Sequence, residues 1–68
     1  MPLIQVKHAS PLSEEQISSL IRDLTEAYVA NSNAAAASVH VIVEQVPNTR
    51  WGVGGRSLRD RNTASNGR

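Results

Sequence analysis

Pro2 is the residue whose type and position point most directly to chemistry. Removal of Met1 would leave the secondary amine of Pro2 as the free N-terminus. An α-amino group titrates near ~8, and burial or a nearby cation lowers its pKa further. A base whose pKa lies close to neutral pH is suited to taking a proton from a carbon next to a carbonyl and returning it at another carbon. An N-terminal Pro2 is thus able to serve as a general base, although residue type and position alone also suit a second residue without a chemical role.

Metal and phosphate chemistry have little support among the other residue types. The chain has no cysteine, which excludes disulfides and thiolate metal sites. Its histidines, His8 and His40, lie far apart and have no cluster of carboxylates beside them. The glycines of residues 51–55 are followed neither by a lysine nor by a strand-to-helix entry, so they do not form a phosphate-binding loop. We expect no metal and no cofactor.

Two segments that would position these residues have the alternating pattern of β-strands. Residues 3–8 alternate apolar and polar side chains from Ile4 onward, and Pro11 ends the pattern because proline lacks the N–H donor that a ladder needs. Residues 39–46 are rich in valine and carry apolar side chains on both faces. A strand of that kind is expected to be covered on both sides.

One long helix is expected between the strands, over residues 13–31. Ser13 and Gln16 have the spacing of a capping box, and Glu14 and Glu15 stand in the first turn, where the helix dipole favours negative charge. Apolar residues then recur at the spacing of one helical face: Ile17, Leu20, Ile21, Leu24, Ala27 and Tyr28. Strand, helix and strand make a βαβ unit whose strands should be parallel.

The C-terminal part of the chain is short and rich in glycine and arginine. Residues 51–55 predict a short hairpin, because glycine adopts backbone angles that other residues avoid. Residues 56–61 predict one turn of helix, and the small polar residues 62–68 predict a disordered tail. The fold class is thus α+β, a single βαβ unit with a C-terminal hairpin.

The small size of the chain predicts self-association. A chain of 68 residues buries only about 60% of the surface that its unfolded form exposes. Small domains without disulfides or metals usually gain stability from association. Two strands and one helix also leave one face and the edges of the sheet uncovered. We therefore expect an obligate oligomer.

Charge and hydropathy limit the other partners. The formal net charge of +1 argues against a general nucleic-acid binder. The positive charge is nevertheless uneven, since five arginines lie near the C-terminus: Arg50, Arg56, Arg59, Arg61 and Arg68. No apolar run approaches the ~20 residues of a bilayer span, and the first residues lack the apolar core of a signal peptide. We expect a cytoplasmic protein without membrane contacts.

These features together resemble the tautomerase superfamily, specifically its short 4-oxalocrotonate (2-hydroxymuconate) tautomerase type. The resemblance rests on Pro2 before an alternating strand, on the Ser-x-Glu-Gln helix start, on residues 38–43 and on the aromatic-Gly-x-Gly-Gly segment at residues 51–55. It implies a tautomerase-like domain over residues 2–61 with the MIF-like fold, assembled as a homohexamer of three dimers. It also implies cofactor-free enol–keto isomerisation with Pro2 as the base.

The chain departs from the family pattern where substrate carboxylates are bound. The family commonly has arginines at the positions of Leu12 and His40, and neither residue here has a guanidinium fork. Trp51 retains the family's aromatic residue, which makes the pocket apolar. Arg50 and Arg56 flank that segment and could supply the missing charge, although both could equally be solvated surface residues. These departures argue against the family's usual dicarboxylate, and we expect a small carbonyl or carboxylate substrate, namely a 2-oxo acid or a related carbonyl compound.

Two further interpretations stay open. The loss of arginine at Leu12 and His40 would also suit a non-catalytic or complementary subunit of a hetero-oligomer. A plain binding module, in which the arginine-rich C-terminus contacts anionic partners, is the third interpretation. Only one aromatic residue lies near that segment, so stacking on single-stranded nucleic acid has little support. Turnover of phenylenolpyruvate or 2-hydroxymuconate by the chain alone would separate the first interpretation from the second.

Overall fold

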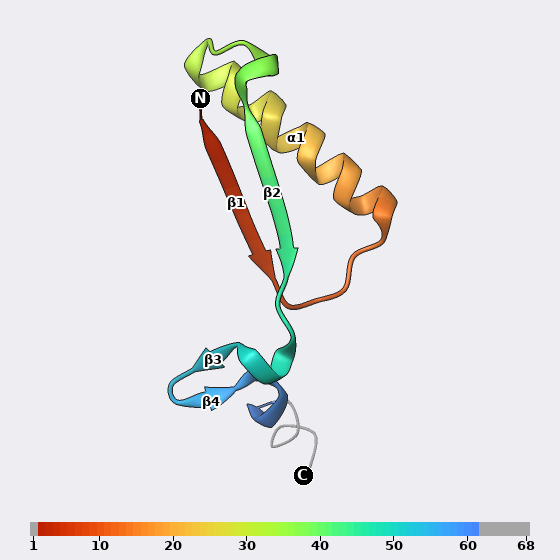
Figure 1. Ribbon diagram of the computed structural model, residues 1–68, viewed down its shortest axis with the longest axis vertical. Helices are drawn as coiled ribbons and strands as arrows, with labels where there is room; N and C mark the ends of the chain where they lie inside the picture. Colours follow the sequence, from red (N-terminus) through yellow and green to blue (C-terminus); the bar gives the residue numbers. More distant parts are fainter. Residues whose placement is uncertain (1, 62–68) are drawn as a thin grey trace.

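The computed structural model describes residues 2–61 and contains the predicted βαβ unit and hairpin (Figure 1). Met1 and the predicted tail at residues 62–68 lie outside the described residues. The elements follow in the order β1 (Leu3–His8), α1 (Glu14–Ser32), η1 (Ala36–Ser38), β2 (His40–Gln45), η2 (Asn48–Arg50), β3 (Gly52–Val53) and β4 (Arg56–Ser57). The α+β class is therefore confirmed, with η1 and η2 as short 3-10 helices.

β1 and β2 pair in parallel along the whole length of both strands. Backbone hydrogen bonds continue the ladder at both ends. The N–H of His40 donates to the carbonyl oxygen of Pro2 at 3.0 Å, and the N–H of Val46 donates to that of His8 at 2.8 Å. The parallel pairing therefore brings Pro2 beside the start of β2, although the two strand starts are 37 positions apart in the sequence.

α1 begins at a capping box and ends at a residue with a left-handed backbone. The N–H of Gln16 donates to Ser13 Oγ at 3.1 Å, and the N–H of Ser13 donates to Gln16 Oε1 at 2.8 Å, so the predicted capping box is present. At the other end Asn33 adopts a left-handed backbone (φ 63°), and its N–H donates to the carbonyl oxygen of Val29 at 3.0 Å. Asparagine tolerates this conformation better than most residues, which ends the helix here.

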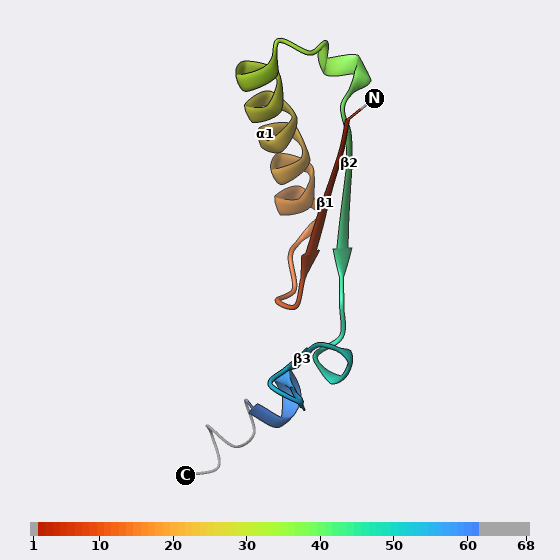
Figure 2. The same cartoon turned by 90° about the vertical axis from the view of Figure 1, so that its left-hand side faces the viewer.

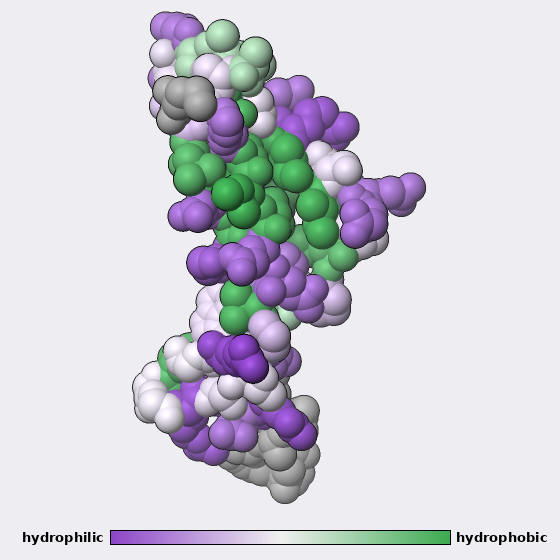
Figure 3. Space-filling model, viewed as in Figure 1, coloured by the Kyte–Doolittle hydropathy of each residue, from purple (hydrophilic) through white to green (hydrophobic). Residues whose placement is uncertain are grey.

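α1 covers one face of the two-stranded sheet and leaves the other face open (Figure 2). Four half-buried strand residues share the helix-facing side: Ile4, Val6, Val41 and Val43. The apolar residues of the opposite face, Leu3 and Ile42, are 54% and 47% exposed. A continuous hydrophobic surface is visible over the sheet on this open face (Figure 3).

The C-terminal hairpin differs in part from the prediction. Gly54 and Gly55 have positive φ values of 63° and 87°, as a two-residue type I′ turn requires. This turn pairs Val53 with Arg56, so Arg56 lies in β4 and does not begin a helix. Helical backbone starts only at residue 58, and the expected helical turn over residues 56–61 was therefore placed two residues too early. The hairpin stands beyond the end of β2, apart from the sheet (Figure 1).

The described chain contains no buried residue. Even Ile21 and Tyr28, which helical spacing assigned to the apolar face of α1, are each 36% exposed. The accessible surface is 5197 Å², whereas a folded monomer of this mass exposes about 4,200 Å². The radius of gyration is 15.9 Å, against about 11 Å for a compact domain of this length. These values agree with a chain that completes its core by association.

The capping box gives the first prediction. Ser13→Ala removes the side-chain acceptor of the Gln16 N–H, and we expect the free energy of unfolding to fall by about 1 kcal/mol. Ser18→Ala is the matched control, because Ser18 is exposed in the interior of the helix, where alanine has the higher helix propensity. Urea denaturation at one fixed protein concentration measures both. Equal stabilities of the two variants would contradict a role for the cap.

Candidate active site

Pro2 is half-buried and stands immediately before β1. Its carbonyl oxygen accepts the hydrogen bond from the N–H of His40, which ties the residue to the neighbouring strand. The proline ring restricts φ, so the residue has little freedom around this anchor. The backbone thus holds Pro2 at a defined place at the N-terminal end of the sheet.

His40 is the predicted site residue that the structure brings next to Pro2. It opens β2 and lies opposite Leu3 in the register. His40 is exposed, and strand alternation places it on the open face of the sheet together with Ile42. An imidazole at this place can donate or accept a hydrogen bond, but it lacks the bidentate fork of a guanidinium.

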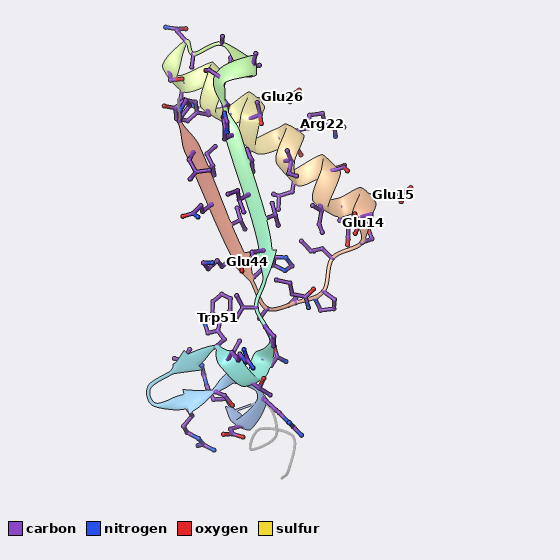
Figure 4. All side chains as sticks on the ribbon, viewed as in Figure 1. Glu14, Glu15, Arg22, Glu26, Glu44 and Trp51 are labelled. Carbon is purple, nitrogen blue, oxygen red and sulfur yellow. The ribbon has the colours of Figure 1, made fainter. Side chains whose placement is uncertain are left out.

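The other three predicted residues lie at the opposite end of the sheet. Arg50 ends η2, Trp51 follows it and Arg56 lies in β4. The six residues of β1 alone span about 20 Å between Pro2 and that end. Figure 4 shows Trp51 beyond the far ends of both strands. One chain therefore cannot bring Trp51, Arg50 or Arg56 to its own Pro2, and a site that combines them needs two chains.

Leu12 has a structural reason for being apolar. It is half-buried and directly precedes the N-cap Ser13, while Ile17 occupies the fourth helical position and is also half-buried. A hydrophobic pair at these two positions is the hydrophobic staple, which fixes the entry of the chain into a helix. Leu12 thus belongs to the helix start and brings no charge to a substrate.

An ion pair on the open sheet face was not anticipated from the sequence. Lys7 and Glu44 lie directly opposite each other in the register, and Lys7 Nζ donates to Glu44 Oε1. This hydrogen bond, together with the positive charge of Lys7, holds the pKa of Glu44 below its ordinary value of 4.5. Strand alternation predicts only the face of its own strand on which each residue lies. The parallel register then places Lys7 directly opposite Glu44.

Residues 2–61 were also compared with the requirements of a metal site and of a membrane-spanning helix. Within residues 2–61 no group of three or more His, Asp or Glu side chains is arranged to hold a metal ion. Among the same residues, no helix combines the length and the apolar composition of a membrane span. An open depression along α1 contains none of the predicted site residues; it is lined by Ser13, Glu15, Gln16, Ser19, Leu20 and Asp23.

Comparison with known proteins gives consistent matches over almost the whole chain. A family model described as "Tautomerase enzyme" matches residues 2–61. The 2-hydroxymuconate tautomerase of Stutzerimonas stutzeri is 36% identical over 59 residues, which cover 87% of this chain and 94% of that protein.

Two solved structures extend this similarity to three dimensions. TomN, a 4-oxalocrotonate tautomerase homologue of the tomaymycin biosynthetic pathway, superposes with a TM-score of 0.86 at 37% identity, covering 91% of this chain and 95% of its own. A heterohexamer 4-oxalocrotonate tautomerase from Chloroflexus aurantiacus has a TM-score of 0.80 at 35% identity, covering 88% and 97%.

The Lys7–Glu44 pair gives a prediction for pH dependence. A lowered carboxyl pKa stabilises the folded state above the unfolded-state pKa, and this contribution disappears as the pH falls through the lowered value. We expect Lys7→Gln to raise the pKa of Glu44 towards 4.5 and to weaken the acid dependence of stability below that pH. An NMR titration of the Glu44 side-chain carboxyl in the wild type and in Lys7→Gln measures the pKa. An unchanged Glu44 titration in Lys7→Gln would rule out this cause.

Proposed function

This chain belongs to the tautomerase family, and we propose that it is a cofactor-free isomerase whose general base is the secondary amine of Pro2. The observation that carries the proposal is the position of Pro2. It is the first residue of the family match, and its carbonyl accepts the His40 N–H at the head of the parallel sheet. Removal of Met1 converts the Pro2 nitrogen from an amide into a basic amine, which the mechanism requires.

The proposed reaction is an enol–keto proton transfer. The uncharged Pro2 amine accepts a proton from the enol oxygen, or from a carbon next to the carbonyl, and leaves a delocalised anion. The resulting ammonium returns the proton to the other end of that anion. The reaction therefore gains and loses neither protons nor electrons overall. General-base catalysis of this kind contributes typically ~10²–10⁴-fold.

The proposed active site is shared between chains. Pro2 and His40 lie at one end of the sheet and Trp51 at the other, so the hairpin of a second copy has to supply the aromatic wall. We propose a homohexamer as the assembly. Burial of Leu3 and Ile42 on the open face would favour association, because fully burying an exposed aliphatic side chain contributes about 1.5–3 kcal/mol.

The proposed substrate class follows from the absence of arginine at positions 12 and 40. Leu12 is apolar and occupies the staple position at the start of α1. His40 can form a single hydrogen bond to a carboxylate but not a bidentate pair. Neither suits a strongly held second carboxylate. We therefore propose a small 2-oxo acid, or a related carbonyl compound, as the substrate.

A complementary subunit of a hetero-oligomer is the second candidate function. The observation that favours it is the same loss of arginine at Leu12 and His40, because a related chain could contribute the missing charge across an interface. The similar protein from Chloroflexus aurantiacus is a heterohexamer. In that case the chain alone would be weakly active or inactive.

Pro2→Ala is the central test of the isomerase proposal. We expect mass spectrometry of the natural protein to find Pro2 as the first residue, and the substitution to lower kcat for phenylenolpyruvate by roughly 10²–10⁴-fold. Alanine retains a primary amine, so some turnover should remain. Circular dichroism should show an unchanged fold, because the backbone carbonyl of the substituted residue can still accept the His40 N–H. Full activity of Pro2→Ala, or retention of Met1 in the natural protein, would exclude this mechanism.

Assembly gives a separate prediction. The purified chain should sediment as a hexamer at micromolar concentration, and dilution should lower its thermal midpoint because folding and association are coupled. Ile42→Asp places a charge on the open face and should dissociate the assembly, whereas Glu15→Gln on exposed α1 should leave it intact. A stable folded monomer would refute the shared site. Hexamers that form only after a second chain is added would favour the hetero-oligomer.

A further inference from the structure

The proposed site needs a cation that the Pro2 end of the sheet does not provide. Leu12 is apolar and His40 has no guanidinium fork, so a substrate carboxylate has no strong partner there. Arg50 and Arg56 flank Trp51 in the hairpin. Either arginine could contact the substrate if the hairpin of a second copy reaches Pro2. The choice between them therefore rests on the proposed function.

The register of the hairpin aligns Arg56 with Trp51. Val53 pairs with Arg56, and the N–H of Leu58 donates to the carbonyl oxygen of Trp51 at 2.8 Å, which continues the ladder by a further pair. Directly opposite residues of an antiparallel pair project to the same face, and every second residue of a strand does so as well. Trp51, Val53 and Arg56 therefore share one face of the hairpin.

Arg50 does not belong to this face. It is the last residue of η2, and its N–H donates to the carbonyl oxygen of Pro47 at 2.9 Å within that turn. The extended backbone begins only at Trp51 (φ −112°, ψ 111°). Arg50 is thus outside the alternation that aligns Trp51 with Val53, and its side chain starts from the turn. Both arginines flank the Trp51 segment in the sequence, but only Arg56 lies on the hairpin face that carries Trp51.

The face with Trp51 has one guanidinium, that of Arg56, beside two apolar side chains. Val53 is 45% exposed and Arg56 is exposed, and the hairpin contacts the rest of its own chain chiefly through η2. A guanidinium binds one carboxylate through two parallel hydrogen bonds. A second carboxylate would lie against Trp51 and Val53 without a partner, which is unfavourable.

We propose that Arg56 binds the substrate carboxylate and that the site takes 2-oxo acids with a single carboxylate and an apolar substituent. The guanidinium of Arg56 orients the carboxylate, and Trp51 packs against the apolar substituent. Pro2 of the other chain then meets the carbon next to the carbonyl. This assignment makes Arg56 the residue that determines specificity, in the place of the arginines absent at Leu12 and His40.

The test uses Trp51, the only tryptophan of the chain, as a fluorescence reporter of binding. Phenylacetate and its neutral isostere phenylacetamide are titrated into the assembled protein; neither can tautomerise at an α-keto group, so turnover does not interfere. We expect the wild type to bind phenylacetate roughly ten- to a hundredfold more tightly than phenylacetamide, as for a charge-assisted contact. Arg56→Gln should abolish this preference, and Arg56→Lys should retain part of it.

Arg50→Gln is the matched control, since it removes the same charge from the end of η2, outside the hairpin face that carries Trp51. It should keep the preference for phenylacetate. With phenylenolpyruvate as substrate, Arg56→Gln should raise KM about tenfold or more and change kcat much less. Sedimentation of each variant checks that the assembly persists, and Arg56→Lys decides the question if Arg56→Gln dissociates.

Two results would overturn the assignment: loss of the preference in Arg50→Gln, or its persistence in Arg56→Gln. Pro2→Ala should still prefer phenylacetate, because binding of the carboxylate does not need the base. A wild type that prefers phenylacetate but has no Pro2-dependent turnover would therefore refute the isomerase proposal and leave the Arg56 assignment standing. A wild type with Pro2-dependent turnover and no preference for phenylacetate would refute the Arg56 assignment and leave the isomerase proposal standing.

Discussion

One helix of 19 residues lies on a sheet of only two strands, and no described part of the chain covers the opposite face of that sheet. Leu3 and Ile42 are consequently exposed, and no described residue reaches full burial. Hydrophobic burial is the main favourable contribution to folding, so such a chain gains its remaining stability from contacts with other chains of an oligomer. In the proposed enzyme the same contacts complete the active site, which couples folding, assembly and catalysis.

The parallel pairing of β1 with β2 has a second consequence. It brings the two strand starts together, so that the N–H of His40 holds the carbonyl of Pro2. The same geometry sends the chain after β2 away from Pro2, and the hairpin with Trp51 therefore lies beyond the other end of the sheet (Figure 4). A parallel βαβ unit of this size thus separates its proposed base from its proposed apolar wall by about one strand length.

Under the proposed function, carboxylate binding would depend on Arg56 in the hairpin instead of on the position of Leu12. Leu12 stands at the staple position of α1, where an apolar side chain favours the helix start. Arg56 stands opposite Val53 because two glycines with positive φ close the hairpin tightly. A cation on this hairpin face would make the substrate preference of the assembly depend on the hairpin rather than on the helix start.

The elements themselves could be predicted from the sequence, because their signals are local. The alternation of residues 3–8, the Ser13–Gln16 capping box and the glycines at residues 54 and 55 each specify their own backbone. The pairing of Arg56 with Val53 also follows from a local feature, the turn at these two glycines, whereas the position of Lys7 opposite Glu44 was decided only by the tertiary structure. Register depends on which residues of distant or turn-linked segments share a hydrogen-bond ladder, and a shift of one residue reverses every face. For this reason the sequence could nominate Pro2, His40, Arg50, Trp51 and Arg56 as site residues, whereas the fold separates Pro2 and His40 from the other three within one chain.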